Sequence, residues 1–119
     1  MKISGVGKLL RIFIGENDKT DGKPLYEDIV LKARQKELAG ATVIKGVAGF
    51  GASSRMHTAK ILRLSEDLPV VIEIIDTEEK LRDFIPVVDK LFEKAGCGGL
   101  LTLELAEVVK YSPKGSVSK

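Results

Sequence analysis

The fold is decided by residues 70–109, which read VVIEIIDTEEKLRDFIPVVDKLFEKAGCGGLLTLELAEVV. The first six of these residues are apolar apart from one Glu and rich in Val and Ile, which predicts a strand. Asp76 and Glu79 follow with the spacing of a capping box, which indicates the start of a helix. The apolar face expected for that helix has helical spacing and consists of Leu81, Ile85, Val88, Phe92 and Ala95. Gly96 then ends the helix, and residues 100–109 read as a long strand.

The first half of the chain has the same order of elements. Residues 9–15 alternate and predict a strand, and residues 16–22 predict a polar turn. Pro24 suits the first turn of a helix that Gly40 would close, and residues 41–48 predict another strand. Two strand–helix–strand halves predict a ferredoxin-like α+β fold, βαββαβ, whose antiparallel four-stranded sheet has the order 4-1-3-2 and carries both helices on one face.

The expected domain organisation is simple. A chain of 119 residues is one domain by size. We expect a flexible lead-in at 1–8, a single domain at 9–111 and a C-terminal tail at 112–119.

Alternation along the strands assigns each side chain to one of two faces of the sheet. The face expected beneath the helices carries Leu10, Ile12, Ile14, Ile72, Ile74, Leu101, Leu103 and Leu105. The opposite face would carry Leu9, Arg11, Phe13, Val43, Lys45, Val47, Val71, Glu73, Ile75, Thr102, Glu104, Ala106 and Val108. An apolar patch of this size is typical of a contact surface, so we expect other subunits to cover it. Glu104, Arg11, Glu73 and Lys45 would then pair across the strands, and the alternative is a mixed face exposed to water.

A long segment with glycines at its start joins the second and third predicted strands. Segments of about twenty residues inside compact domains are usually functional or mobile. Gly46, Gly49 and Gly51 can let the backbone approach a ligand, and Arg55 and His57, with Lys60 beyond, add positive charge and donors. The pattern fits a phosphate site or a simple flexible loop, and it matches neither a P-loop nor a Rossmann fingerprint.

Composition excludes several classes of function. The net charge is only +2 and no basic stripe is interleaved with aromatics, which argues against nucleic acid as a partner. One cysteine, Cys97, and one histidine, His57, leave no metal cluster and no His-based catalytic pair within one subunit, although a symmetric trimer could gather three copies of His57. No catalytic constellation is visible, so we expect no enzyme activity. Neither a signal peptide nor a membrane-spanning run is present, which predicts a cytoplasmic protein without membrane insertion.

Several motifs together resemble the family called domain of unknown function 190. They are residues 10–16 (LRIFIGE), 23–26 (KPLY), 40–43 (GATV), 49–51 (GFG), 55–57 (RMH), 64–70 (LSEDLPV) and 72–76 (IEIID). Members of that family look like relatives of the PII (GlnB-like) signalling proteins and of the CutA-type proteins, which are ferredoxin-like trimers.

The resemblance implies a homotrimeric PII-like signalling protein that binds an adenine nucleotide, AMP or ATP, between subunits near the long segment. The residues it implies as ligand contacts are Lys45, Gly46, Gly49, Phe50, Gly51, Arg55 and His57. We expect no required cofactor, and the PII relationship alone suggests a protein or transporter target. The PII-type modified tyrosine is absent, since Tyr26 and Tyr111 lie elsewhere. The alternatives are a CutA-like structural or metal-binding trimer and, third, a small phosphotransferase or hydrolase.

Overall fold

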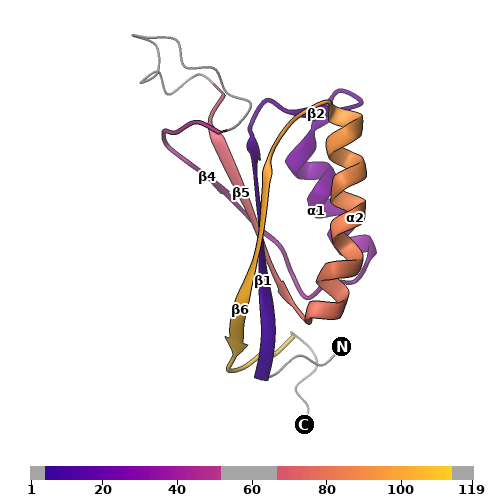
Figure 1. Ribbon diagram of the computed structural model, residues 1–119, viewed down its shortest axis with the longest axis vertical. Helices are drawn as coiled ribbons and strands as arrows, with labels where there is room; N and C mark the ends of the chain where they lie inside the picture. Colours follow the sequence, from indigo (N-terminus) through magenta and orange to yellow (C-terminus); the bar gives the residue numbers. More distant parts are fainter. Residues whose placement is uncertain (1–4, 52–66, 114–119) are drawn as a thin grey trace.

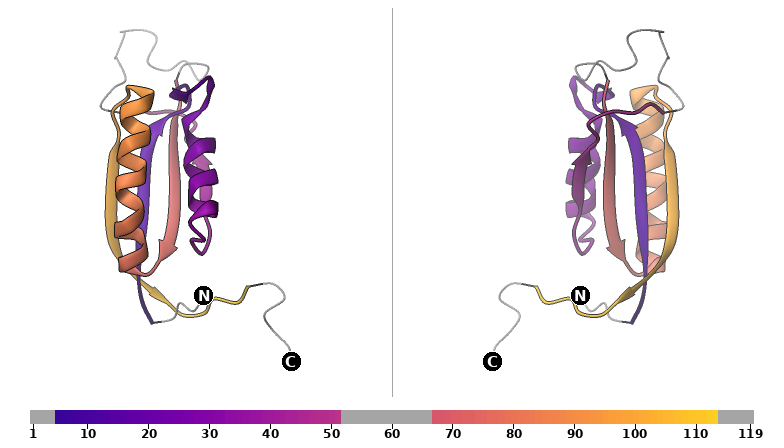
Figure 2. Two further views of the ribbon diagram at one scale, coloured as in Figure 1. Left: turned by 90° about the vertical axis from the view of Figure 1, so that its right-hand side faces the viewer. Right: turned by 90° about the vertical axis from the view of Figure 1, so that its left-hand side faces the viewer.

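The structure is a computed structural model that describes residues 5–51 and 67–113. Four antiparallel strands form one sheet in the order β4-β5-β1-β6, and two helices cover one of its faces (Figures 1 and 2). The elements are β1 (Gly5–Gly15), β2 (Lys19–Thr20), β3 (Lys23–Pro24), α1 (Leu25–Gln35), β4 (Thr42–Lys45), β5 (Pro69–Asp76), α2 (Glu78–Ala95) and β6 (Leu100–Val108). The predicted ferredoxin-like fold and its strand order are therefore confirmed.

The core lies between the sheet and the two helices. Alternate residues of β1 and β5 point into it and are almost fully buried: Leu10, Ile12, Ile14, Val70, Ile72 and Ile74. The helices contribute Leu25, Ile29, Ala33, Leu81, Phe84, Val88 and Leu91. Burying one such large apolar side chain contributes about 1.5–3 kcal/mol, so this layer is the main source of stability.

Leu105 was predicted to lie in this core, and that prediction is wrong. Its side chain is 67% exposed, because it lies opposite Lys8, where the helical layer stops. Lys8 is also paired with Asp76, the last residue of β5, and the chain turns away there into α2. β1 and β6 continue beyond this point as a two-stranded ribbon that neither α1 nor α2 covers. For the same reason β1 begins at Gly5, four residues earlier than predicted.

Helix α2 has the predicted extent, but a different residue caps it. Thr77 is the N-cap, and its hydroxyl accepts a hydrogen bond from the backbone N–H of Lys80 at 3.3 Å. Asp76, which was expected to cap the helix, is fully buried and accepts from the N–H groups of Ala39 (2.9 Å) and Thr77 (2.6 Å). At the other end Gly96 has φ 66° and closes the helix as predicted.

Helix α1 ends earlier than its sequence predicts. Glu37, with φ 60°, turns the chain in the left-handed conformation. The N–H of Leu38 then reaches back to the carbonyl of Ala33 at 3.1 Å, as in a Schellman motif. Gly40 therefore does not close the helix, and residues 38–41 lead into β4.

A short hairpin, β2–β3, replaces the polar turn that was predicted before α1. Asp21 and Gly22 have φ 51° and 81°, the positive values that a two-residue hairpin turn of type I′ requires at both central positions. The hairpin buries Thr20, whose hydroxyl donates to Asp28 in α1 at 3.0 Å, so it is packed against the helix.

The faces of β4 are the reverse of those predicted. Val43 is opposite Ile72 and packs against the core. Thr42 is opposite Glu73 and Ile44 is opposite Val71, on the face of the sheet that α1 and α2 do not cover, which we call the helix-free face. Shifting a strand by one residue moves each of its side chains to the other face. Lys45 accordingly lies on the helix side of the sheet, and Val47 lies beyond the end of β4.

Candidate functional site

The end of the sheet at which β4 stops and β5 begins carries the predicted ligand segment. Two backbone hydrogen bonds hold it together. Gly46 N–H donates to the carbonyl of Pro69 at 2.8 Å, and Glu16 N–H donates to the carbonyl of Leu68 at 2.8 Å. Leu68, just before β5, is thus fixed by the chain leaving β1, and Pro69, the first residue of β5, is fixed by the chain leaving β4. The candidate residues 45–51 therefore start from a fixed point, which we call the base of the β4–β5 segment and which consists of Glu16, Lys45, Gly46, Leu68 and Pro69.

Two of the three predicted glycines have a packing reason to be glycine. A Cβ atom at Gly46 would lie 2.7 Å from Cγ of Pro69, and one at Gly49 would lie 3.2 Å from the same atom. Gly49 also has φ 146°, which L-residues rarely adopt. Both glycines let the chain fold closely over the Pro69 ring. A Cβ at Gly51 would meet nothing within 4 Å, so packing does not explain that glycine.

Phe50 presents a large apolar surface at this end of the molecule. Its side chain is 68% exposed, and that of Val47 is 79% exposed. An exposed aromatic ring between two glycines is available for stacking or for contact with another chain. The other two predicted contacts, Arg55 and His57, lie outside the described residues.

Of the predicted ligand residues that the structure describes, Lys45 is the charged one, and it is already paired. Its Nζ lies 2.7 Å from Oε2 of Glu16. The hydrogen bond and charge of Glu16 raise the pKa of Lys45 above its usual value. The pairing of Lys45 with Glu73 that alternation predicted is therefore wrong, because the register of β4 turns Lys45 to the opposite side of the sheet from Glu73.

Acidic side chains hold the turn after β1, a feature that the sequence analysis did not identify. Asp67 accepts from the N–H of Asn17 at 2.8 Å, and Asp18 accepts from the N–H of Gly15 at 2.8 Å. The thiol of Cys97 lies nearby, and burial together with the charge of Asp18 raises its pKa to about 11. Cys97 is therefore protonated at neutral pH, which makes it a poor nucleophile.

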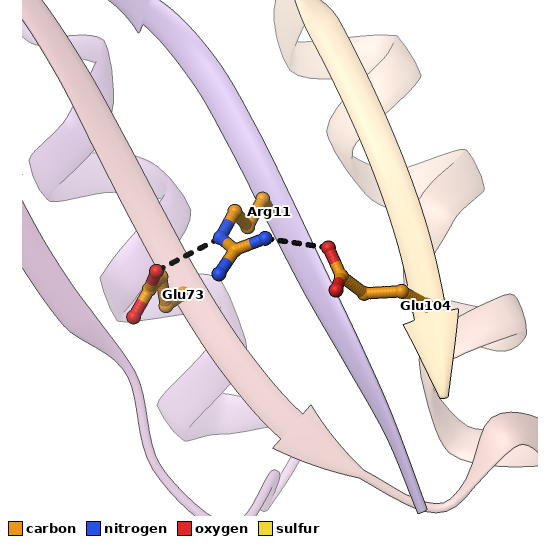
Figure 3. Close-up of polar contacts among 3 residues, drawn as sticks. All are labelled: Arg11, Glu73 and Glu104. Atoms are coloured by element: carbon orange, nitrogen blue, oxygen red, sulfur yellow. Dashed lines mark hydrogen bonds and ion pairs between the residues drawn. The ribbon is translucent and has the colours of Figure 1, made fainter. Parts of the chain in front are cut away.

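The helix-free face carries a charge cluster that alternation did predict in part. Arg11 on β1 lies between two carboxylates, with its Nε 2.9 Å from Glu73 on β5 and its Nη1 bonded to Glu104 on β6 (Figure 3). The hydrogen bond to Glu73 is the largest cause of a raised pKa at Arg11. Three of the four residues in the predicted series thus come together, and they form one hydrogen-bonded unit across three strands.

A groove of about 610 Å³ lies on the helix-free face, at the end of the sheet that is opposite the segment between β4 and β5. The segment that follows β6 passes under the end of the sheet (Figure 2), and the hydroxyl of Tyr111 donates to the carbonyl of Ala39 at 3.1 Å. This segment forms one wall, and Thr42 and Ile75 line the other. The groove could not be predicted from the sequence, because no local motif marks a strand extension that folds across its own sheet.

Two features are absent from the described residues. Neither helix is long and apolar enough to cross a membrane. Residues 5–51 and 67–113 contain no group of three His, Cys, Asp or Glu side chains arranged to hold a metal ion.

Two solved structures of PII-like proteins are similar to this chain in fold. CPII from Thiomonas intermedia K12, bound to ADP and bicarbonate, superposes with a TM-score of 0.64 and 17% identity over 88% of this chain and 90% of CPII. A putative PII-like signalling protein from Thermus thermophilus gives a TM-score of 0.61 and 16% identity over 88% of this chain and 91% of that protein. Because the identity is this low, the likeness shows that the fold is PII-like and shows nothing about function.

Sequence relatives identify the family. A UPF0166 protein of Aquifex aeolicus is 41% identical over 102 residues, which are 86% of this chain and 92% of the relative. A UPF0166 protein of Methanocaldococcus jannaschii is 36% identical over 103 residues, which are 87% of this chain and 92% of that relative. Residues 7–108 match the family DUF190, described as an uncharacterised ACR. The resemblance found in the sequence motifs is thereby confirmed, and the chain belongs to the DUF190 family.

Proposed function

We propose that this protein is a cytoplasmic PII-like regulator that binds an adenine nucleotide between the subunits of a homotrimer. One observation carries the proposal: the chain shares its fold, over 88% of its length, with a PII-like protein whose structures hold ADP or both ADP and AMP. The proposed site is the base of the segment between β4 and β5. A regulator of this kind would pass its ligand state on to a protein partner.

The local chemistry at this base supports a nucleotide as ligand. Gly46 has already given its N–H to Pro69, so the backbone donors would come from Gly49, Phe50 and Gly51. The exposed ring of Phe50 is suited to stack on a purine, since every base offers a π-face to an aromatic side chain. The ammonium group of Lys45 would attract the phosphate, together with Arg55 and His57.

The apolar part of the helix-free face supports the association of subunits. Phe13, Val71 and Ile44 are directly opposite one another on β1, β5 and β4, and Ile44 is 46% exposed in the single chain. A row of large apolar side chains across three strands favours burial against another surface. The unit of Arg11, Glu73 and Glu104 adjoins this row and would fix the register of the contact.

Calorimetric titration with AMP, ADP and ATP tests the proposed function. We expect saturable binding of at least one of them, and weaker binding by Lys45→Met and Phe50→Ala. Lys94→Met is the matched control, because Lys94 also makes a 2.7 Å pair, with Asp21, but on α2 and the hairpin. Absence of binding at millimolar nucleotide would contradict the proposal. Equal loss of affinity in Lys45→Met and Lys94→Met would contradict the placement of the site.

A further inference from the structure

Backbone hydrogen bonds at or next to Glu16 and Lys45 hold this pair of residues in place. Glu16 follows β1 and donates its N–H to Leu68, whereas Lys45 ends β4 and is followed by Gly46, which donates to Pro69. The two side chains therefore meet across the first residues of β5, with 2.7 Å between Nζ and Oε2. Side-chain rotation alone can separate them, since neither backbone has to move.

Among the described residues of this region, anions outnumber cations. Among the described residues 15–18, 45–51 and 67–69, Lys45 is the only cation, and Glu16, Asp18 and Asp67 are the anions. Asp18 and Asp67 are occupied by the backbone N–H groups of Gly15 and Asn17, which hold their carboxylates in place. Glu16 is the carboxylate that directly contacts the lysine, so a phosphate approaching Lys45 has to replace it.

We infer that Glu16 is a specificity-determining residue at the base of the β4–β5 segment. Its charge lowers the affinity for ATP relative to ADP and for ADP relative to AMP. The inference rests on the proposed function. The Glu16 carboxylate offsets the attraction of Lys45 for a phosphate, and the loss of attraction grows with each charge added to the ligand. At a separation of about 8 Å in water, one charge changes the affinity for each ligand charge roughly twofold. Salt weakens this discrimination, because the Debye length is about 10 Å at 0.1 M ionic strength.

The test is calorimetric titration of AMP, ADP and ATP into wild-type protein and Glu16→Gln, at low and high salt. Glu16→Gln keeps the size of the side chain and removes its charge. We expect the ratio of ATP to AMP affinity to rise roughly fourfold at low salt, twofold for each of the two added phosphate charges, and to rise less at high salt. Asp21→Asn is the matched control, because it removes a carboxylate from a lysine pair of the same length, and it should leave the ratio unchanged. Lys45→Gln is the complementary variant and should weaken ATP binding more than AMP binding.

The outcomes separate this inference from the proposed function. If Lys45→Gln weakens binding and Glu16→Gln leaves the ATP to AMP ratio unchanged, the site stands and the role of Glu16 is refuted. If Glu16→Gln binds ATP while the wild type binds only AMP, the role of Glu16 is supported. If neither wild type nor Glu16→Gln binds any of the three nucleotides at millimolar concentration, both proposals are overturned.

Discussion

Replacing Asp76 with alanine should destabilise the protein and loosen one wall of the groove. The Asp76 carboxylate is fully buried and accepts two backbone N–H groups, that of Ala39 at 2.9 Å and that of Thr77 at 2.6 Å. It thereby ties the chain between α1 and β4 to the end of β5. The Asp76→Ala variant leaves both donors without their partner.

The magnitude follows from those two donors. A buried polar group left without its partner costs about 1–3 kcal/mol, so two partly shielded N–H groups should cost about 2–4 kcal/mol together. Domains of this kind are stable by about 5–15 kcal/mol, which means that the variant still folds but loses a large share of its stability. The melting temperature should fall by roughly 10 °C. Asp76→Asn retains one acceptor oxygen and should lose about half as much.

Urea unfolding followed by circular dichroism measures the free energy of unfolding, and hydrogen exchange localises the effect. Exchange should accelerate first at residues 39–42. This segment lines the groove, and its Ala39 carbonyl accepts a hydrogen bond from the Tyr111 hydroxyl. Asp89→Ala is the control, because Asp89 is an exposed aspartate of α2 and should change stability by less than about 0.5 kcal/mol. A loss in Asp76→Ala no larger than in Asp89→Ala would refute the reasoning.

Three further predictions concern single positions. Gly46→Ala should lower the free energy of unfolding in urea by about 1–3 kcal/mol, because its Cβ would lie 2.7 Å from Pro69 Cγ. An unchanged free energy of unfolding would contradict this close packing. Thr77→Ala should cost about 1 kcal/mol through loss of the N-cap bond to Lys80, whereas Thr77→Ser should restore most of it. Cys97, with its pKa raised to about 11, should react with iodoacetamide at pH 8 about 100-fold more slowly than free cysteine, with a rate that rises up to about pH 11. A labelling rate that levels off near pH 8.5 would contradict this environment.

The fold could be predicted because its signals are periodic and repeated. Alternation over residues 9–15 and 70–75 placed Ile12 and Ile72 correctly in the core, and helical spacing together with Gly96 gave the extent of α2. One error lies where two neighbouring residues can serve the same purpose. Asp76 and Thr77 are both good N-cap residues, and burial of the carboxylate decides between them.

The candidate site could be predicted only in part. Strand β4 has four residues, Thr42–Lys45, and its alternation fits either register, so sequence alone could not tell which way Lys45 points. Its partner Glu16 is 29 positions away in the sequence, and no local pattern joins them. The hydrogen bond between Tyr111 and Ala39 likewise joins residues 72 positions apart that no local pattern connects.

The most direct test of the central proposal is the mass of the protein in dilute solution, measured by light scattering after size exclusion. If copies of the chain cover the helix-free face and form the nucleotide cleft between them, the mass at micromolar concentration should be three times the 12.9 kDa of one chain. A mass of 12.9 kDa under the same conditions would contradict both the covered face and the cleft.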